Sequence, residues 1–274
     1  MKQRLITALV AGIFFMIFVL LGGEWFEAFV YLIATIAFIE LLRMRKIAKY
    51  KIPSVVSILM LWVLLSPELG MINAMFDVHI NKTDILLFSV ILLLSYTVLA
   101  KNRFTFEDAG FLLITVVYIG FGFLYFLITR NAEDVIIEGH VVTGLAKFIF
   151  VLVVIWATDS GAYFFGKAFG KHKLWPTISP NKTIEGGIGG LLLGCVAGII
   201  FQVISPVNAS IWVVIGVCVL IAVFGQLGDM VESAFKRHYL VKDSGKILPG
   251  HGGILDRFDS MIFVFPILHL IQFI

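Results

Sequence analysis

The sequence is poor in charge and in cysteine. Only 14% of its 274 residues are Asp, Glu, Lys or Arg, whereas a soluble domain carries about a quarter. Because charges this sparse cannot cover a water-facing surface, lipid must cover much of the chain. Cys195 and Cys218 both lie in apolar runs, which excludes a disulfide framework or zinc site and predicts buried thiols. P-loop, zinc, GxSxG and Rossmann motifs are also absent.

Apolar sequence takes the place of charge. The chain is 60% hydrophobic, and its mean hydropathy is +1.01. A helix needs roughly 20 apolar residues to cross a bilayer of about 30 Å. The pattern predicts an all-α polytopic integral membrane protein with about nine transmembrane helices, of which the third and ninth are short. The stretches lie near residues 5–22, 26–42, 53–66, 84–100, 109–129, 142–165, 184–205, 211–231 and 260–274.

The positions of the basic residues predict the orientation. With a cytoplasmic N-terminus, 18 of the 21 Lys and Arg fall on the cytoplasmic side, as the positive-inside rule requires. The first stretch shows no clear small-residue cleavage site and is interpreted as a retained helix. The cytoplasmic segments are then 1–4, 43–52, 101–108, 166–183 and 232–259.

The two parts of the chain differ in polar content. Residues 1–140 have little polar material inside their spans, and we expect a transmembrane scaffold of about five helices with a dimer surface. Residues 141–274 carry two large polar cytoplasmic loops and are the predicted catalytic region. An ionisable group inside a span is costly unless it pairs or meets water, so Asp159 is a functional candidate. The alternative for Asp159 is an ion pair that only holds helices together.

The first polar loop, residues 171–185, contains the sequence SPNKTIE. Ser179 before Pro180 fits an N-cap followed by proline at the first helical position. A helix start presents free N–H groups that suit phosphate oxygens, with Asn181 and Lys182 as further donors. Glu185, close to the span, is also a candidate site residue.

Glycines follow this loop at every fourth position. Gly186, Gly190, Gly194 and Gly198 fall on one face of the predicted helix. Small residues on one face let another helix approach closely. We therefore expect these glycines to pack helices and not to bind a nucleotide.

The second polar loop is the densest polar region. If the preceding helix continues past residue 231, Asp229, Ser233 and Lys236 or Arg237 share one face. The loop from Lys242 to Gly253 is rich in Pro and Gly, which prevents a helix and suits a concave anion site. Asp256 and Asp259, three apart, then open the last span on one helix face.

Carboxylates, cations and a glycine-rich loop together point to one chemistry. Oxygen ligands hold Mg²⁺, and Mg²⁺ with Lys and Arg holds phosphates. Phosphoryl or nucleotidyl transfer depends mainly on positioning and charge neutralisation. A structural salt-bridge cluster is the alternative, but carboxylates this close would repel each other without a metal. His251 fits either a general base or a phosphate donor.

The last 120 residues or so resemble a known family. The run SAFKR, four residues, KD, then LPGHGGILDRFD, within Ser233–Asp259, resembles the signature of the bacterial and eukaryotic phosphatidate cytidylyltransferases (CDP-diacylglycerol synthases). The Asp159 and Ser179–Gly186 segments also look like family features. The resemblance implies that CTP and phosphatidate give CDP-diacylglycerol and pyrophosphate, that the enzyme uses Mg²⁺ with a second cation left open, and that it forms a homodimer. Nucleic acid is not an expected partner.

The resemblance also implies roles for individual residues. Asp229, Asp256 and Asp259 would bind the metal, with Asp243 a weaker candidate for the same role. The residues expected to contact the triphosphate or the lipid phosphate are Lys236, Arg237, Lys242, His251 and Arg257. The residues expected to complete the substrate site are Ser179, Asn181, Lys182, Glu185, Asp159, Ser233, Gly252 and Gly253.

Two alternatives stay open. A CTP-dependent lipid-alcohol (polyprenol-type) kinase would transfer the γ-phosphate of CTP to a hydroxyl. A cation transporter would use the intramembrane aspartates but has no need for a basic loop ending in Gly-His-Gly-Gly. The expected location is a bacterial plasma membrane, with the active site facing the cytoplasm.

Overall fold

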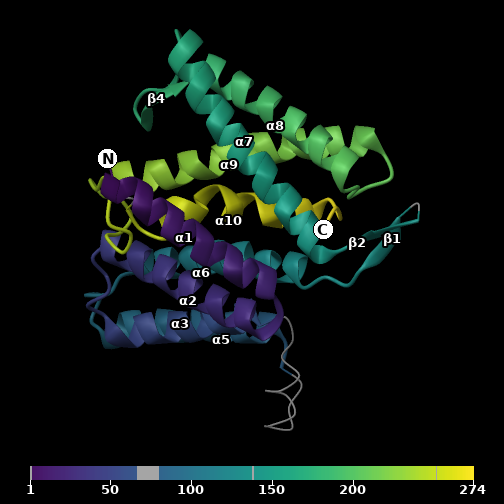
Figure 1. The fold of residues 1–274 in the computed structure, drawn as a ribbon. Helices are drawn as coiled ribbons and strands as arrows, with labels where there is room; N and C mark the ends of the chain where they lie inside the picture. The colour runs from purple at the N-terminus through teal and green to yellow at the C-terminus, as the bar shows by residue number, and fades with distance from the viewer. Residues whose placement is uncertain (1, 67–79, 138, 251) are drawn as a thin grey trace.

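The computed structural model describes residues 2–66, 80–137, 139–250 and 252–274. Within these ranges the chain forms nine helices and two short antiparallel hairpins, β1 with β2 and β3 with β4 (Figure 1). The elements, in order, are α1 (Lys2–Leu21), α2 (Gly23–Met44), α3 (Lys51–Leu65), α5 (Lys82–Leu99), α6 (Phe106–Arg130), β1 (Val135–Ile137), β2 (His140–Val142), α7 (Gly144–Phe169), β3 (Lys173–Trp175), β4 (Ser179–Thr183), α8 (Ile184–Ile204), α9 (Ile211–His238) and α10 (Leu255–Leu270).

Each of the nine predicted apolar stretches coincides with one of these described helices. Six helices, α2, α5, α6, α7, α8 and α9, are long and apolar enough to cross a membrane. The two stretches that the sequence marked as short form α3, with 15 residues, and α10, with 16. The chain therefore has the architecture of an α-helical membrane protein. The two hairpins are a departure from the all-α prediction.

Helix starts follow the local sequence. Asn81 and Thr105 each accept a hydrogen bond from the backbone N–H three residues later, and Asp84 and Asp108 return one. These reciprocal contacts are capping boxes. Thr143 caps α7 in the same way, without the returned bond.

The predicted helix start at Ser179 is wrong. Residues Ser179–Thr183 form strand β4, paired with β3, and α8 begins four residues later than predicted, with Thr183 as its N-cap. The Thr183 hydroxyl accepts the Gly186 N–H at 3.1 Å. Pro180 disfavours the α region for Ser179, which fits a strand, and Thr183 is also one of the residue types preferred as an N-cap.

The glycine face of α8 packs as predicted. A Cβ at Gly190 would lie 2.6 Å from the Thr158 carbonyl oxygen, and one at Gly186 would lie 2.7 Å from that of Ala162. Both carbonyls belong to α7. Helices α7 and α8 therefore touch backbone to backbone, which only glycine allows here.

Helix α10 lies at the centre of the bundle (Figure 1) and packs against phenylalanines of α6 and α7. Phe265 stacks edge-on against Phe126 of α6, with ring centroids 5.0 Å apart, and lies 5.2 Å from Phe148 of α7. Phe258, about two turns earlier on α10, also packs against Phe126. These contacts bury the short α10 among longer helices and fix its N-terminal turn, where two of the predicted aspartates lie.

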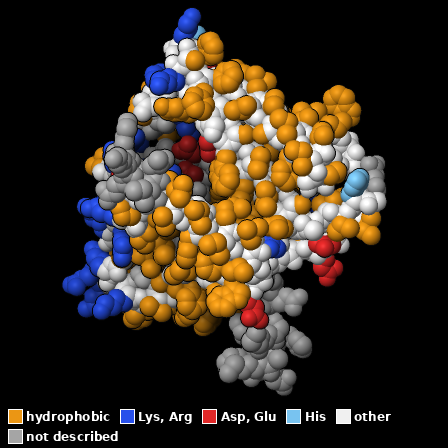
Figure 2. Space-filling model, in the orientation of Figure 1, with side chains coloured by type: hydrophobic (Ala, Val, Ile, Leu, Met, Phe, Trp, Pro, Cys, Tyr) orange, Lys and Arg blue, Asp and Glu red, His pale blue; other side chains and the backbone are white. Residues whose placement is uncertain are grey.

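The outer surface is apolar over much of its area (Figure 2). On α8, large hydrophobic side chains remain exposed along one face: Ile188, Leu192, Val196, Ile200 and Val203. An exposed stripe of this length is unfavourable in water and suits contact with lipid. Cys195 and Cys218 are both free thiols; Cys218 is buried as predicted, whereas Cys195 is only partly buried.

Candidate active site

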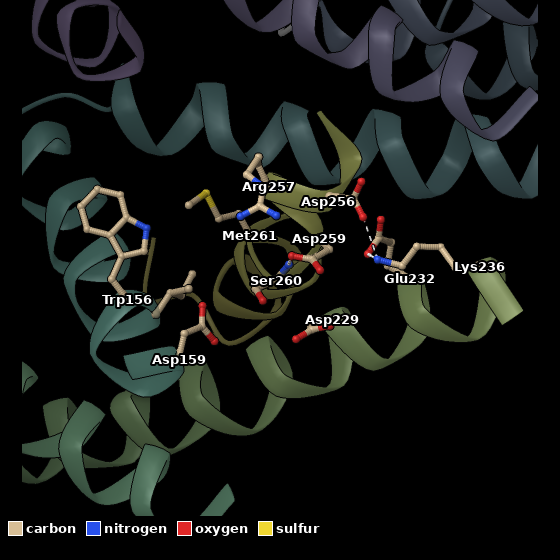
Figure 3. A pocket seen from close by; sticks show the side chains of 11 residues that line it. Trp156, Asp159, Asp229, Glu232, Lys236, Asp256, Arg257, Asp259, Ser260 and Met261 are labelled. Carbon is tan, nitrogen blue, oxygen red and sulfur yellow. Dashed lines mark hydrogen bonds and ion pairs between the residues drawn. The ribbon is translucent and has the colours of Figure 1, made fainter. Parts of the chain in front are cut away.

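A cavity of about 380 Å³ lies where α7, α9 and α10 meet. Asp159 comes from α7, and Asp229 comes from α9. Arg257 and Asp259 come from α10. The carboxylates of the three aspartates point toward one space (Figure 3), and acidic side chains are also visible inside a hollow of the surface (Figure 2). The remaining lining residues are Ile155, Trp156, Glu232, Lys236, Asp256, Ser260 and Met261.

Helical spacing brings these groups together as the sequence predicted. Helix α9 continues to His238, so Asp229 and Lys236 lie on the face that lines the cavity. Asp256 and Asp259 lie three apart in the first turns of α10 and line it too. The segment between the two helices is non-helical.

Lys236 is held between two carboxylates. Its Nζ lies 2.5 Å from Glu232 Oε2 and 2.7 Å from Asp256 Oδ1. Only 1% of the Glu232 side chain is exposed. Its second oxygen, Oε1, is buried without a hydrogen-bond partner among the described atoms. A buried oxygen of this kind is costly unless a ligand, ion or water meets it.

Asp256 organises the loop before α10. Its Oδ2 accepts the N–H groups of Ser244 and Gly253 and the Ser244 hydroxyl, each at 2.8 Å. Burial acts to raise the pKa of Asp256, but hydrogen bonds from Lys236 and Gly253 outweigh it and lower the pKa to about 2. Asp256 is therefore ionised at neutral pH and ties the loop to Lys236.

A second cavity, of about 450 Å³, adjoins the first. The two share Asp159 and Asp229 as a common wall. Lys182 of β4 lines the second cavity, and its Nζ lies 2.7 Å from Asp229 Oδ2. The other residues around the second cavity are Ala162, Tyr163, Gly166, Lys167, Leu174, Asn181, Thr183, Gly186, Gly187 and Gln226.

Several predicted residues lie outside both cavities. Glu185 instead accepts the backbone N–H groups of Lys171 and His172 and contacts the His172 ring at 2.6 Å. Arg237 donates from Nε to the Ile178 carbonyl at 3.1 Å. Both residues therefore stabilise the β3–β4 hairpin. Ser179, Lys242 and Asp243 line neither cavity.

The remaining predicted residues shape the loop or α9. Ser233 donates to Asp229 Oδ1 at 3.4 Å. Gly252 has φ +86°, a conformation that favours glycine, and a Cβ there would overlap Asp256 Oδ2. Gly253 also packs where a side chain would not fit. His251 lies outside the described residues.

Sequence reasoning missed two acidic residues. Glu232 was not selected as a candidate, although it shares a helix face with Lys236 at a four-residue step. Glu40 lies in the N-terminal half, where no candidate was named. It accepts hydrogen bonds from the backbone N–H groups of residues 254 and 255 and lies 3.1 Å from the Ser244 hydroxyl. An acid deep inside an apolar span was the available signal for Glu40.

Mg²⁺ requires oxygen donors that converge on one point. Among the described side chains, no group of three or more His, Cys, Asp or Glu is arranged as a ready metal site. Mg²⁺, however, binds through one or two carboxylates together with waters and substrate phosphates. Asp229 and Asp259 converge on the cavity, so the donors fit this mode of binding. Asp256 has its oxygens engaged by Lys236 and the loop.

Comparison with known proteins shows the family of this chain. The sequence model of the cytidylyltransferase family matches residues 2–274. The phosphatidate cytidylyltransferase of Bacillus subtilis (strain 168) is 47% identical over 272 residues, covering 99% of this chain and 97% of that protein. Proteins of the same name from Staphylococcus haemolyticus (strain JCSC1435) and Staphylococcus aureus (strain COL) are 46% and 45% identical over 271 residues, covering 99% of this chain and 98% of each relative. With its carboxylate-lined cavity and a match over nearly its whole length, the chain belongs to the cytidylyltransferase family.

Proposed function

We propose that this chain transfers the cytidylyl group of CTP to phosphatidate, giving CDP-diacylglycerol and pyrophosphate. The observation that carries the proposal is the pair of adjoining cavities with Asp159 and Asp229 as their common wall. Relatives that carry the name of this activity match nearly the whole chain.

The reaction needs two anions to meet. An oxygen of the phosphatidate phosphate attacks the α-phosphorus of CTP, a P–O bond forms, and the bond to pyrophosphate breaks. A phosphate monoester is already largely ionised near neutral pH, so no strong general base is needed. Lys236, Lys182 and Arg257 lie at the cavities and are positioned to neutralise and orient the phosphates.

Mg²⁺ is the proposed cofactor, with Asp229, Asp256 and Asp259 as its carboxylates. Asp229 and Asp259 face the first cavity directly, whereas Asp256 would have to release Lys236 to bind a metal. When bound, Mg²⁺ supplies charge neutralisation at the α-phosphate and leaving group. Lys182 already holds Asp229 in place at 2.7 Å.

The composition of the cavities suggests which substrate each takes. The first cavity holds most of the carboxylates and suits a metal-bound triphosphate. The second has Lys182 and Asn181 beside Tyr163 and Leu174, so cations adjoin apolar side chains. That combination suits a lipid phosphate with its glycerol backbone. We therefore assign CTP to the first cavity and the phosphatidate headgroup to the second.

The membrane arrangement is part of the proposal. We propose nine spans with the N-terminus in the cytoplasm of a bacterial cell, the active site facing the cytoplasm, and a homodimer in the bilayer. Lys and Arg gather at the end of the bundle where the chain begins and where α2 leads into α3 (Figures 1 and 2). This asymmetry supports a cytoplasmic position for that end.

The decisive experiment uses purified protein in detergent with phosphatidate, Mg²⁺ and CTP labelled at the α- or the γ-phosphate. Cytidylyl transfer puts the α-label in the lipid and the γ-label in pyrophosphate. A lipid-alcohol kinase would instead put the γ-label in lipid and release CDP. Cation flux into proteoliposomes without CTP would indicate a transporter. Either of the last two results would overturn the proposal.

A further inference from the structure

Glu40 is a buried acid in the first half of the chain. It lies near the C-terminal end of α2 and is 2% exposed, between the buried Phe38 and Leu41. A carboxylate taken out of water needs hydrogen-bond partners to remain stable. The partners that the structure gives Glu40 all come from the α9–α10 segment, more than 200 residues further along the chain.

Two of these partners belong to the start of α10. The N-cap residue is Ile254, whose side chain cannot cap a helix. Glu40 Oε1 accepts the Ile254 N–H and Oε2 accepts the Leu255 N–H, both at 3.0 Å. Free N–H groups at a helix start need acceptors, and negative charge is favourable there. Glu40 therefore supplies from α2 the cap that the local sequence lacks.

The third partner connects Glu40 to the cavity. The Ser244 hydroxyl lies 3.1 Å from Glu40 Oε2 and 2.8 Å from Asp256 Oδ2. Asp256 in turn holds Lys236 at 2.7 Å. Contacts thus run from α2 through the loop to a cation that lines the first cavity.

Glycines allow the loop to close around Glu40. A Cβ built at Gly245 would overlap Glu40, and the nearest atoms to it are all Glu40 side-chain atoms. A Cβ at Gly253 would overlap both Glu40 and Ser244. The chain is shaped to admit this carboxylate at close range.

We infer that Glu40 is a positioning residue for cytidylyl transfer: it caps α10 and, through Ser244, fixes Asp256 and Lys236 at the cavity. Glu40 does not line either cavity, so its effect is exerted through these residues. The inference rests on the proposed function.

The first test is Glu40→Gln in the full-length chain, purified in detergent. Glutamine keeps the shape but replaces one acceptor oxygen with an NH₂ group that cannot accept an N–H. We expect kcat per folded molecule to fall about tenfold, with the KM values for CTP and phosphatidate within about threefold, since a displaced neighbour lowers the rate without removing a substrate contact. Glu24→Gln, an exposed acid of the same helix, is the matched control and should match wild type.

The second test is a double-mutant cycle between Gly245→Ala and Glu40→Ala. Alone, Gly245→Ala must push the carboxylate aside and should lower both kcat and the melting temperature. In the Glu40→Ala background the carboxylate no longer occupies that space, so adding Gly245→Ala should change neither kcat nor the melting temperature further. Such non-additivity reports direct contact. Gly216→Ala, where a Cβ meets nothing within 4 Å, is the glycine control and should be additive.

The outcomes separate the two proposals. An active wild type whose Glu40→Gln variant keeps normal kcat per folded molecule, or an additive cycle, overturns the positioning role. A merely structural Glu40 would lower the melting temperature and the folded yield but leave kcat per folded molecule unchanged. A wild type that forms no labelled liponucleotide overturns the proposed function instead, while the cycle measured by melting temperature still tests the contact.

Discussion

Lys182 of β4 and Asp229 of α9 form an ion pair of 2.7 Å in the wall shared by the two cavities. The pair joins the β3–β4 hairpin to α9, which also carries Glu232 and Lys236 at the first cavity. It also places one cation within reach of both proposed substrates.

Removing this cation should weaken lipid binding. We expect Lys182→Gln to raise the KM for phosphatidate about tenfold or more, because a hydrogen bond to a charged group contributes about 1.5–3 kcal/mol. Steady-state kinetics with mixed micelles would measure it. Lys173→Gln removes the same charge from an exposed position of the same hairpin and should leave KM unchanged. Equal effects of the two variants would contradict the assignment of the second cavity.

Asp256 should be indispensable for turnover. Asp256→Asn removes the charge that holds Lys236 and replaces one oxygen that accepts from the loop. We expect CTP-dependent turnover to fall at least about 100-fold, while the protein still inserts into the membrane and folds. Asp134→Asn, exposed next to β1, serves as the control. Near-normal activity of Asp256→Asn would remove Asp256 from the site.

Activity should depend on Mg²⁺. Chelation with EDTA should abolish liponucleotide formation, and added Mg²⁺ should restore it. Asp259→Asn should raise the Mg²⁺ concentration that gives half-maximal activity, because one of the carboxylates facing the cavity is lost. Full activity in EDTA, or an unchanged Mg²⁺ titration in this variant, would contradict the metal assignment.

The contact between α7 and α8 should tolerate no side chain. Gly190→Ala would place a Cβ 2.6 Å from the Thr158 carbonyl, and overpacking of this kind costs about 1–3 kcal/mol. Thermal unfolding in detergent should show a lower melting temperature. Gly216→Ala has open space around its Cβ and should be neutral or slightly stabilising, since alanine favours a helix over glycine.

The orientation of the chain in the membrane can be measured by the accessibility of introduced cysteines to a maleimide reagent. In intact cells, a membrane-impermeant maleimide should label Asp134→Cys, beside β1, and should label Lys246→Cys, in the α9–α10 loop, only after permeabilisation. Both positions are exposed. The unmodified chain, with Cys195 and Cys218 inside helices, gives the background. The reverse pattern would place the site on the outer face.

The helices were predictable because the apolar pattern that determines each one lies within its own segment of the sequence. Apolar stretches locate every described helix, although α9 extends seven residues past its stretch and α10 begins five residues before its own. Four-residue spacing anticipated the glycine face of α8. The start of α8 was misplaced because Ser179 and Thr183 are both good caps, and only pairing with β3 distinguishes them. A strand that short depends on its partner more than on its own sequence.

The site was predictable where residues share a helix. Asp229 with Lys236, and Asp256 with Asp259, line the same cavity as their spacing required. Contacts between distant segments were not predictable: Glu185 holds His172, and Arg237 holds the Ile178 carbonyl. Both had been assigned to substrate because charge near a signature does not reveal which partner a side chain reaches.

Because Glu40 caps α10 from the first half of the chain, we expect the C-terminal half to depend on the N-terminal half when the two are expressed as separate fragments. Separate expression of residues 1–140 and 141–274 would leave the C-terminal fragment with bare N–H groups at Ile254 and Leu255, so we expect the fragments to regain activity only when co-expressed. Chimeras that exchange the first half between relatives should stay active only if the incoming half brings a carboxylate at position 40. We therefore expect the two halves to be active only as a pair in which residue 40 of the first caps α10 of the second.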